Sequence, residues 1–338
     1  MKPFNLSKAG TAVSLILLLI GNPNGSFAWS NRGHRAVNLI AAESFPKQMP
    51  AFIRSAAAIR QISYLGPEPD RWRPEIAPEL GSTSSPDHVF RLELGEQLGS
   101  LPRRRYDLLH DLEQLHDAQK DSAGLMTAQH IGTMPWQSLE VFERLVSAFH
   151  SYRIVNGEFP AAGYADMAPM TKDDMPDVEA SILFYSGWLG HYIGDGCMPL
   201  HDTVNLAGWA ENENPHGYNT KGEIHHRLEV VVDAALETGK LDPKKIEQQV
   251  APARHLDDPF VAILDYVRME NGHQEEVYQI DQRGGITGSG SPELHRFVEK
   301  RMSEGGAMLR DLIYTAWIDS AALSTPRREA RVPFSKLK

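Results

Sequence analysis

Residues 177–201 read DVEASILFYSGWLGHYIGDGCMPLH. Apolar side chains recur with the 3.6-residue period of an α-helix as far as Gly194, and Pro199 should end that helix. His191 and Asp195 stand four positions apart, so a helix places both side chains on one face, one turn apart. His201 then follows in the turn just beyond. The stretch predicts an apolar helix that presents a histidine and a carboxylate together.

Helical periods also occur on both sides of this stretch. They span residues 32–43, 104–119, 135–153, 223–236, 259–272 and 294–322. No segment shows a sustained alternation of apolar and polar residues, so we do not expect a large sheet. We predict an all-α fold, with a single mostly helical domain over residues 29–322 and long loops. Residues 323–338 are polar and basic and should form a flexible C-terminal tail.

The first 28 residues have the features of a secretory signal peptide. A basic start and a short apolar run over residues 12–20 precede the small residue Ala28. The run is too short to span a bilayer comfortably, so no stable membrane anchor is expected. Cleavage between Ala28 and Trp29 predicts a secreted or periplasmic protein. Trp29 would start the mature chain, and its free amine and carbonyl can chelate a metal.

The net charge places only a weak limit on the substrate. Removal of residues 1–28 takes away Lys2, Lys8 and no acidic residue, so the formal charge changes from −10 to −12. An acidic surface does not attract polyanions unaided, but bound zinc would reverse the sign locally. Neither a nucleic acid nor a phospholipid is therefore excluded.

Cys197 is the only cysteine, so no intrachain disulfide can form. It lies between Asp195 and His201, and a role as a metal ligand is one interpretation. We favour the simpler one, a small buried residue at a helix end.

A second pair of metal-binding side chains lies in residues 223–229, which read EIHHRLE. His225 and Glu229 repeat the four-residue spacing, whereas His226 does not. Imidazole nitrogen and carboxylate oxygen are the usual non-sulfur ligands of zinc. The two motifs together predict a metal centre.

Further residues extend this set. His34 lies five positions after Trp29, and His88 and Asp70 are candidates to complete a site for several ions, with Asp87 as the alternative to Asp70. Each residue alone is more simply a capping, core or surface residue, but the whole set in this order is hard to attribute to chance. The predicted metal ligands are Trp29, His34, Asp70, His88, His191, Asp195, His201, His225 and Glu229.

In this order the motifs resemble the superfamily that unites zinc-dependent phospholipase C with the single-strand-specific nucleases of the S-one/P-one type. The family pattern is a mature N-terminal Trp, a nearby His, an Asp and a His, then His-x3-Asp, Pro-Leu-His and His-x3-Asp/Glu. The chain matches this pattern in order from Trp29 to Glu229, and its terminal helix with Ile313-Tyr-Thr-Ala-Trp317 is also similar.

The resemblance implies three Zn²⁺ ions in a cleft of the helical domain. The first would take Asp70, His88, His191 and Asp195, the second His201, His225 and Glu229, and the third the Trp29 amine and carbonyl, His34 and Asp195. Zinc would neutralise a phosphodiester, lower the pKa of a water and stabilise the leaving oxygen. Asp70 is also the catalytic candidate, since it would orient or deprotonate that water.

The signals for the substrate conflict. The related nucleases place a base-stacking aromatic residue directly after the second-segment histidine, where this chain has Val89, with Phe90 one step later. Glu229 is closer to the phospholipase pattern, whereas the Asn-rich loop that starts at Asn205 is longer than a compact phospholipase needs. Val89, Phe90 and Asn205 are the predicted substrate-binding residues.

We therefore predict a secreted zinc-dependent phosphodiesterase and favour a nuclease acting on single-stranded nucleic acid or nucleotides. One alternative is a phospholipase C acting on phospholipid. Another is a non-enzymatic secreted helical protein with structural zinc. Structural zinc sites are closed, whereas His201, His225 and Glu229 supply only three ligands, which favours catalysis.

Overall fold

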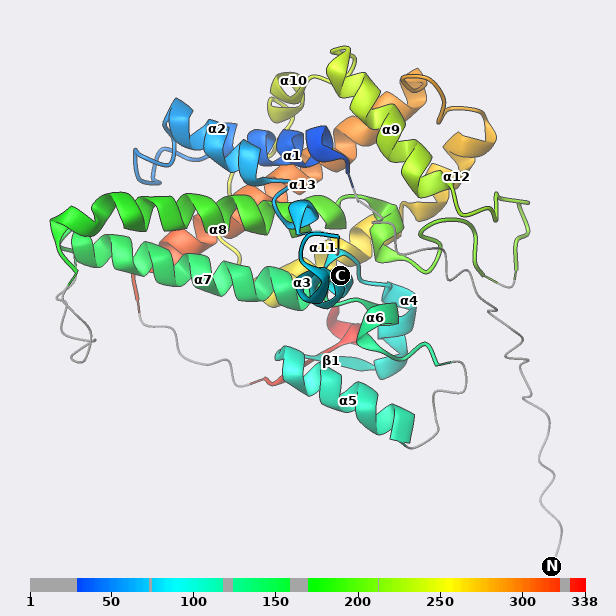
Figure 1. Ribbon diagram of the computed structural model, residues 1–338, viewed down its shortest axis with the longest axis horizontal. Helices are drawn as coiled ribbons and strands as arrows, with labels where there is room; N and C mark the ends of the chain where they lie inside the picture. Colours follow the sequence, from blue (N-terminus) through cyan, green and yellow to red (C-terminus); the bar gives the residue numbers. More distant parts are fainter. Residues whose placement is uncertain (1–28, 73–74, 118–123, 159–169, 212, 323–328) are drawn as a thin grey trace, which may run out of the picture.

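The computed structural model describes residues 29–72, 75–117, 124–158, 170–211, 213–322 and 329–338. Over these ranges the chain is mostly helical, and its one sheet has two short strands (Figure 1). The all-α prediction is confirmed. None of the helices in these ranges is both long and apolar enough to cross a lipid bilayer. The predicted signal peptide, residues 1–28, lies outside the described residues.

All seven predicted helices are present. They are α1 (Asn31–Glu43), α5 (Arg105–Asp117), α7 (Met134–Val155), α8 (Met175–Gly196), α9 (Ile224–Glu237), α11 (Pro259–Asn271) and α13 (Pro292–Asp319). The periodicity did not predict the shorter helices α2 (Ala56–Leu65), α3 (Pro78–Ser84), α4 (Leu92–Gly95), α6 (Ala128–Ile131), α10 (Pro243–Glu247) and α12 (Gln274–Gln282). Single 3₁₀ turns link them at η1 (Pro69–Arg71), η2 (Ser85–His88), η3 (Glu96–Leu98), η5 (Lys172–Asp174), η6 (Pro199–Asp202) and η7 (Phe334–Lys336).

Helix α8 lies at the centre of the molecule. It runs beside α7, and α1 and α2 pack on it from the other side, while α13 crosses behind (Figure 1). Glycines of α8 permit this close approach. A Cβ at Gly190 would lie 2.0 Å from Asn38 Oδ1, and one at Gly187 would lie 2.3 Å from Leu65 Cβ. Larger residues at these positions would push α1 and α2 away from α8.

Asn38 holds the three helices together. Its buried Nδ2 donates to the carbonyl of Ile62 (2.9 Å) on α2 and to that of Gly187 (3.0 Å) on α8. Because a buried amide is costly when unpaired, these bonds favour one arrangement of α1 against α8. His34, one turn before Asn38 on α1, is thereby directed toward the last turns of α8.

The predicted flexible tail is corrected for its last residues. Strand β2 (Arg331–Pro333) pairs antiparallel with β1 (Ser100–Pro102), and Phe334 is buried beyond it. Arg331 also forms an ion pair with Asp111 (2.7 Å). Burial of Val332 and Phe334 offsets the cost of ordering this segment. Residues 323–328 lie outside the described residues.

Cys197 fits the interpretation of a buried residue at a helix end. It is the C-cap of α8, is fully buried, and accepts a hydrogen bond at Sγ from the Trp29 indole Nε1 (3.2 Å). Burial raises the pKa of its thiol, which disfavours the thiolate that binds metals.

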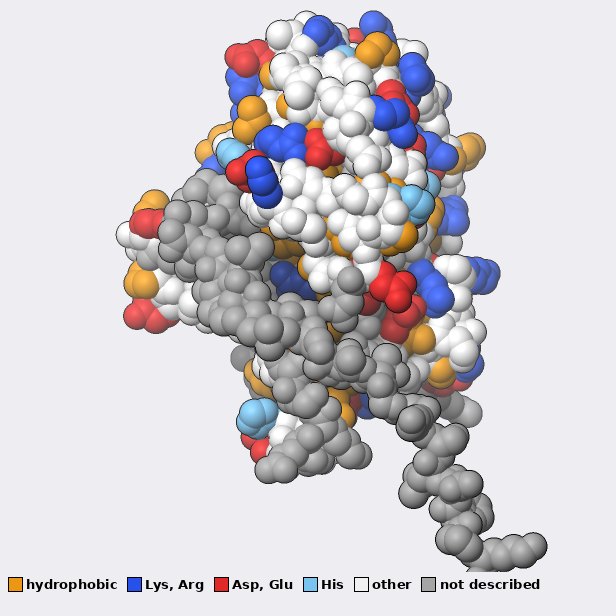
Figure 2. Space-filling model, turned by 90° about the vertical axis from the view of Figure 1, so that its right-hand side faces the viewer, with side chains coloured by type: hydrophobic (Ala, Val, Ile, Leu, Met, Phe, Trp, Pro, Cys, Tyr) orange, Lys and Arg blue, Asp and Glu red, His pale blue; other side chains and the backbone are white. Residues whose placement is uncertain are grey.

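Surface charge is mixed where it can be seen. On the described part of the face in Figure 2, basic and acidic side chains are interspersed. Among the described residues many charged side chains are paired, such as Arg227 with Asp281 (2.7 Å) and Arg283 with Glu293 (2.8 Å). The net negative charge therefore does not gather into one patch on the described part of that face.

Candidate metal centre

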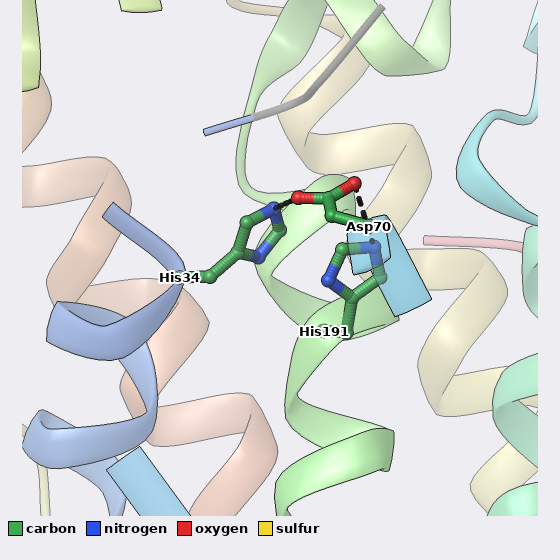
Figure 3. A group of neighbouring side chains, drawn as sticks. All are labelled: His34, Asp70 and His191. Atoms are coloured by element: carbon green, nitrogen blue, oxygen red, sulfur yellow. Dashed lines mark ion pairs between the residues drawn. The ribbon is translucent and has the colours of Figure 1, made fainter. Parts of the chain in front are cut away.

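Three distant segments meet at the C-terminal half of α8. His34 comes from α1, Asp70 from η1 and His191 from α8, and the Asp70 carboxylate lies between the two imidazoles (Figure 3). Asp70 Oδ2 is 3.7 Å from His34 Nε2, and Oδ1 is 3.8 Å from His191 Nε2. The two imidazole rings stack with centroids 4.1 Å apart. These three residues form a group that could hold a metal ion.

A second group shares His191 with the first. Asp195 Oδ2 lies 3.4 Å from His191 Nε2 and 3.7 Å from His88 Nδ1, while Asp195 Oδ1 lies 3.5 Å from His34 Nε2. His88, His191 and Asp195 could also hold a metal ion. The two groups together are called the five-residue cluster: His34, Asp70, His88, His191 and Asp195.

The polar atoms of this cluster are buried, and most lack protein partners. Among the described residues no hydrogen bond reaches either ring nitrogen of His34, Nδ1 of His88, Nε2 of His191 or either carboxylate oxygen of Asp195. Separations of 3.4–3.8 Å are too long for good hydrogen bonds. They approach the spacing of roughly 3.3 Å between nitrogen or oxygen ligands of a tetrahedral zinc. The distances between these nitrogen and oxygen atoms therefore suit ligands around a shared metal ion better than hydrogen bonds between the side chains.

A three-residue cluster, His201, His225 and Glu229, lies next to the first. Nε2 of His201 is 2.7 Å from Nε2 of His225, and Nε2 of His225 is 3.6 Å from Glu229 Oε1. All three side chains are buried, whereas that of His226 is 79% exposed. The predicted helical register is thus confirmed, with His225 rather than His226 facing inward.

Backbone carbonyls orient two of the imidazoles. Nδ1 of His191 donates to the carbonyl of Gly66 (2.9 Å), and Nδ1 of His201 donates to the carbonyl of His88 (2.5 Å). With the proton on Nδ1, the lone pair of Nε2 faces the cluster and is ready to bind a metal.

Electrostatics keeps the imidazoles neutral and disfavours ionised carboxylates in the metal-free site. Burial lowers the pKa to about 3 at His34 and His225, to about 4 at His88, and well below the usual value at His191 and His201. Burial, with the Asp70 charge second, raises the pKa of Asp195 well above its usual range and that of Glu229 to about 9. Neutral imidazoles are the form that binds metals.

Asp70, rather than Asp87, lies with the histidines of the five-residue cluster. Asp87 accepts hydrogen bonds at Oδ1 from Arg105 Nη1 (2.8 Å) and Thr133 Oγ1 (2.7 Å). Its charge is thus taken up outside the cluster, where it fixes η2, which carries His88. Asp70 is the carboxylate that reaches the five-residue cluster.

The side chain of Trp29 lies beside the metal centre. The indole is fully buried, packs where Gly33 leaves room, and binds Cys197, two residues after Asp195. This contact anchors the start of α1 close to the end of α8. Metal binding by the Trp29 amine and carbonyl stays a prediction.

The predicted substrate-binding residues fare less well. Phe90 is fully buried and packs edge-on against Trp136, with ring centroids 5.6 Å apart. Asn205 is also fully buried, and its amide binds Glu211 (3.1 Å) and the backbone of Ala210 (2.8 Å). We predicted that Phe90 and Asn205 contact a substrate. The structure instead gives both residues structural roles in the protein interior. Val89 is 8% exposed, and its contact with a substrate stays a prediction.

The residues that hold the ligand side chains in position were not predicted from the sequence. Tyr192 stacks its ring on His88, with centroids 5.9 Å apart, and its hydroxyl accepts from Trp188 Nε1 (3.0 Å). Its apolar context indicated only a core residue. The Gly66 carbonyl has no signal in the sequence because any residue offers one. No protein-family model matches this chain, and no curated protein matches it in sequence.

Proposed function

We propose that the protein is a secreted or periplasmic zinc-dependent phosphodiesterase whose substrate is single-stranded nucleic acid or nucleotides. One observation carries the proposal: buried imidazole and carboxylate atoms of His34, His88, His191, Asp195 and Glu229 converge without hydrogen-bond partners among the described residues. Leaving such atoms unpaired costs roughly 1–3 kcal/mol each, so a bound ligand must compensate. Nitrogen and oxygen ligands without a thiolate suit zinc.

The ligands divide between ions according to position. Asp70, His88, His191 and Asp195 would hold one zinc, and His34 with Asp195 and the Trp29 terminus would hold another. The three-residue cluster would hold a third with fewer protein ligands. An incomplete ligand set leaves positions open, as catalytic zinc sites do, which argues against purely structural zinc.

Zinc, when bound, supplies positive charge against the phosphate and lowers the pKa of a nearby water. The chain itself supplies position. The Asp70 side chain is 10% exposed at the edge of the five-residue cluster, where its carboxylate would orient the attacking water and accept its proton. The carbonyls of Gly66 and His88 keep His191 and His201 in the tautomer that binds metal. Burial excludes competing water from the ligands.

A panel of substrates tests this proposal. Mature protein beginning at Trp29, loaded with zinc, should hydrolyse single-stranded DNA, RNA or 3′-mononucleotides and lose that activity after chelation. The zinc-loaded protein should not hydrolyse phosphatidylcholine. Cleavage of phosphatidylcholine with no cleavage of single strands would replace the proposed nuclease by a phospholipase C. The aliphatic Val89 next to His88 favours this alternative. Hydrolysis of none of these would overturn the enzymatic proposal.

A further inference from the structure

Aromatic side chains gather on the surface next to the metal centre. Trp72 and Trp188 meet edge to face, with ring centroids 5.5 Å apart. Phe184 and Tyr185, one turn earlier on α8, lie 5.8 and 6.4 Å from Trp188. The four rings come from two separate elements, so helix periodicity alone does not account for their meeting.

Tyr64 lies near this group through its contact with Arg71. The Arg71 guanidinium stacks over the Tyr64 ring at 4.5 Å, and its Nη2 contacts the Tyr64 carbonyl at 3.3 Å. Arg71 and Trp72 are consecutive, so Tyr64 connects through them to the tryptophans. We call Tyr64, Arg71, Trp72, Trp188, Phe184 and Tyr185 the aromatic track.

The track is continuous with the metal centre. Arg71 and Trp72 directly follow the ligand Asp70 in the chain, and Trp188 lies one turn before the ligand His191. Trp188 also donates to the Tyr192 hydroxyl (3.0 Å), whose ring stacks on His88. A polymer with one phosphate at the ligands would therefore have its neighbouring units beside these rings.

These rings are accessible and held in place. Tyr64 is 51% and Phe184 37% exposed, and Trp72, Trp188 and Tyr185 are half-buried. Neighbouring rings and the Arg71 guanidinium restrict their motion, so little entropy is lost when a ligand stacks on them. An exposed group of large aromatic residues marks a binding surface more often than chance.

Charge distinguishes the kind of ligand. Arg71 already forms an ion pair with Glu68, so it adds little free positive charge. Arg35 and Arg144 also lie beside the track, over the Tyr64 and Trp188 rings at 5.7 and 5.8 Å. An anionic membrane surface would require several uncompensated cations. Stacking of bases needs only ring faces and edges and tolerates any sequence. The ligand that fits is a flexible chain of bases whose phosphates are bound elsewhere.

We propose that the aromatic track binds the bases that flank the scissile phosphate of a single-stranded nucleic acid. This inference rests on the proposed nuclease function and adds a site for several nucleotides. Its binding energy comes from stacking, at roughly 1–3 kcal/mol per base, rather than from charge.

The test compares two uncleavable probes on the zinc-loaded mature protein. One is a fluorescent phosphorothioate dodecathymidylate, and the other is an abasic phosphorothioate of the same length. Trp72→Ala should weaken binding of the first about tenfold or more and leave the second unchanged, since one stacked base contributes roughly 1–3 kcal/mol. Trp72→Phe should restore most of the loss, and Tyr64→Ala, at an exposed position, gives a second variant that should fold. Tyr106→Ala is the matched control because Tyr106 is 84% exposed on α5 and outside the track.

The outcomes separate the track from the proposed function. Equal binding of the two probes, or unchanged binding in Trp72→Ala and Tyr64→Ala, overturns the track even if the enzyme cleaves DNA. Track-dependent binding without hydrolysis of any phosphodiester supports the track and removes the nuclease. Trp72-dependent binding of phosphatidylcholine vesicles in place of the oligonucleotide would contradict the proposal and assign the rings to a lipid surface.

Discussion

The five-residue cluster and the ion pair of α13 both bury ionisable side chains but complete them differently. Arg310 donates from Nε (2.9 Å) and Nη2 (2.6 Å) to Asp311 Oδ1, and Arg254 Nε donates to Oδ2 (2.9 Å). Asp195, equally buried, has no hydrogen-bond partner among the described residues. Since an unpaired buried carboxylate is costly, the ion pair of α13 is complete within the protein, whereas the five-residue cluster requires a ligand.

The largest effect is expected from Asp195→Asn. Asp195 is shared by both groups of the five-residue cluster, so its loss should remove zinc and lower phosphodiester hydrolysis on the order of 10³-fold or more, because zinc contributes several kcal/mol to the transition state. The metal-free variant should unfold in urea at the same or a higher midpoint, since an unpaired carboxyl is gone. A marked destabilisation of the metal-free protein would break the contrast.

Asp311→Ala should give the opposite pattern. Removing Asp311 leaves Arg310 buried without its main partner, which should lower the free energy of unfolding by about 3–5 kcal/mol. Zinc content per folded molecule should stay the same. Urea denaturation with zinc analysis of the folded fraction measures both, and a loss of zinc without a loss of stability would argue against the distinction.

Glu229→Ala sharpens the comparison within the centre. It removes one of three protein ligands from the three-residue cluster, so hydrolysis should fall on the order of a hundredfold, with weaker zinc binding there. His226→Ala is the control, because His226 is 79% exposed on the same helix and only its Nδ1 approaches Glu229, at 3.6 Å from Oε2, on the side away from His225. An inactive His226 variant beside an active His225→Ala would show that the assigned ligand is wrong.

The smallest expected effect is the release of protons when zinc binds. In the metal-free protein burial raises the pKa of Glu229 to about 9, so its carboxyl is protonated at pH 7, and burial shifts the pKa of Asp195 in the same direction. The imidazoles, with lowered pKa values, are already neutral. Zinc must displace the proton of the Glu229 carboxyl, so a proton is released on binding and zinc affinity rises with pH up to about 9. Calorimetry in buffers of different ionisation enthalpy measures this release, which Glu229→Gln should reduce. Zinc uptake without proton release at pH 7 would contradict the raised pKa values.

The sequence predicted what depends on short-range spacing. The four-residue intervals His191–Asp195 and His225–Glu229 specify one face of a helix, and both pairs face the centre. The long helices were predicted because their apolar stripes extend over several turns. Helix α2 was missed although Ser55 accepts a hydrogen bond from the Ala58 N–H as its N-cap, because ten residues give few turns of periodicity.

Contacts between distant segments could not be predicted. The choice of Asp70 over Asp87 depends on Arg105, which lies beyond both in the chain and binds Asp87. The hydrogen bonds of Asn38 to α2 and α8, and its close approach to Gly190, join segments far apart in the chain. No pattern of neighbouring residues predicts them. Strand β2 is only three residues long, so alternation could not reveal it.

Zinc analysis of the mature protein tests the central claim most directly. Protein that begins at Trp29, purified without chelator and dialysed against trace-metal-free buffer, should contain about three zinc ions per chain, because two adjacent clusters and the N-terminal amine supply ligands for that number. Asp195→Asn should lower the count and Asp311→Ala should not. One zinc or none in the unaltered mature protein would contradict a trinuclear centre.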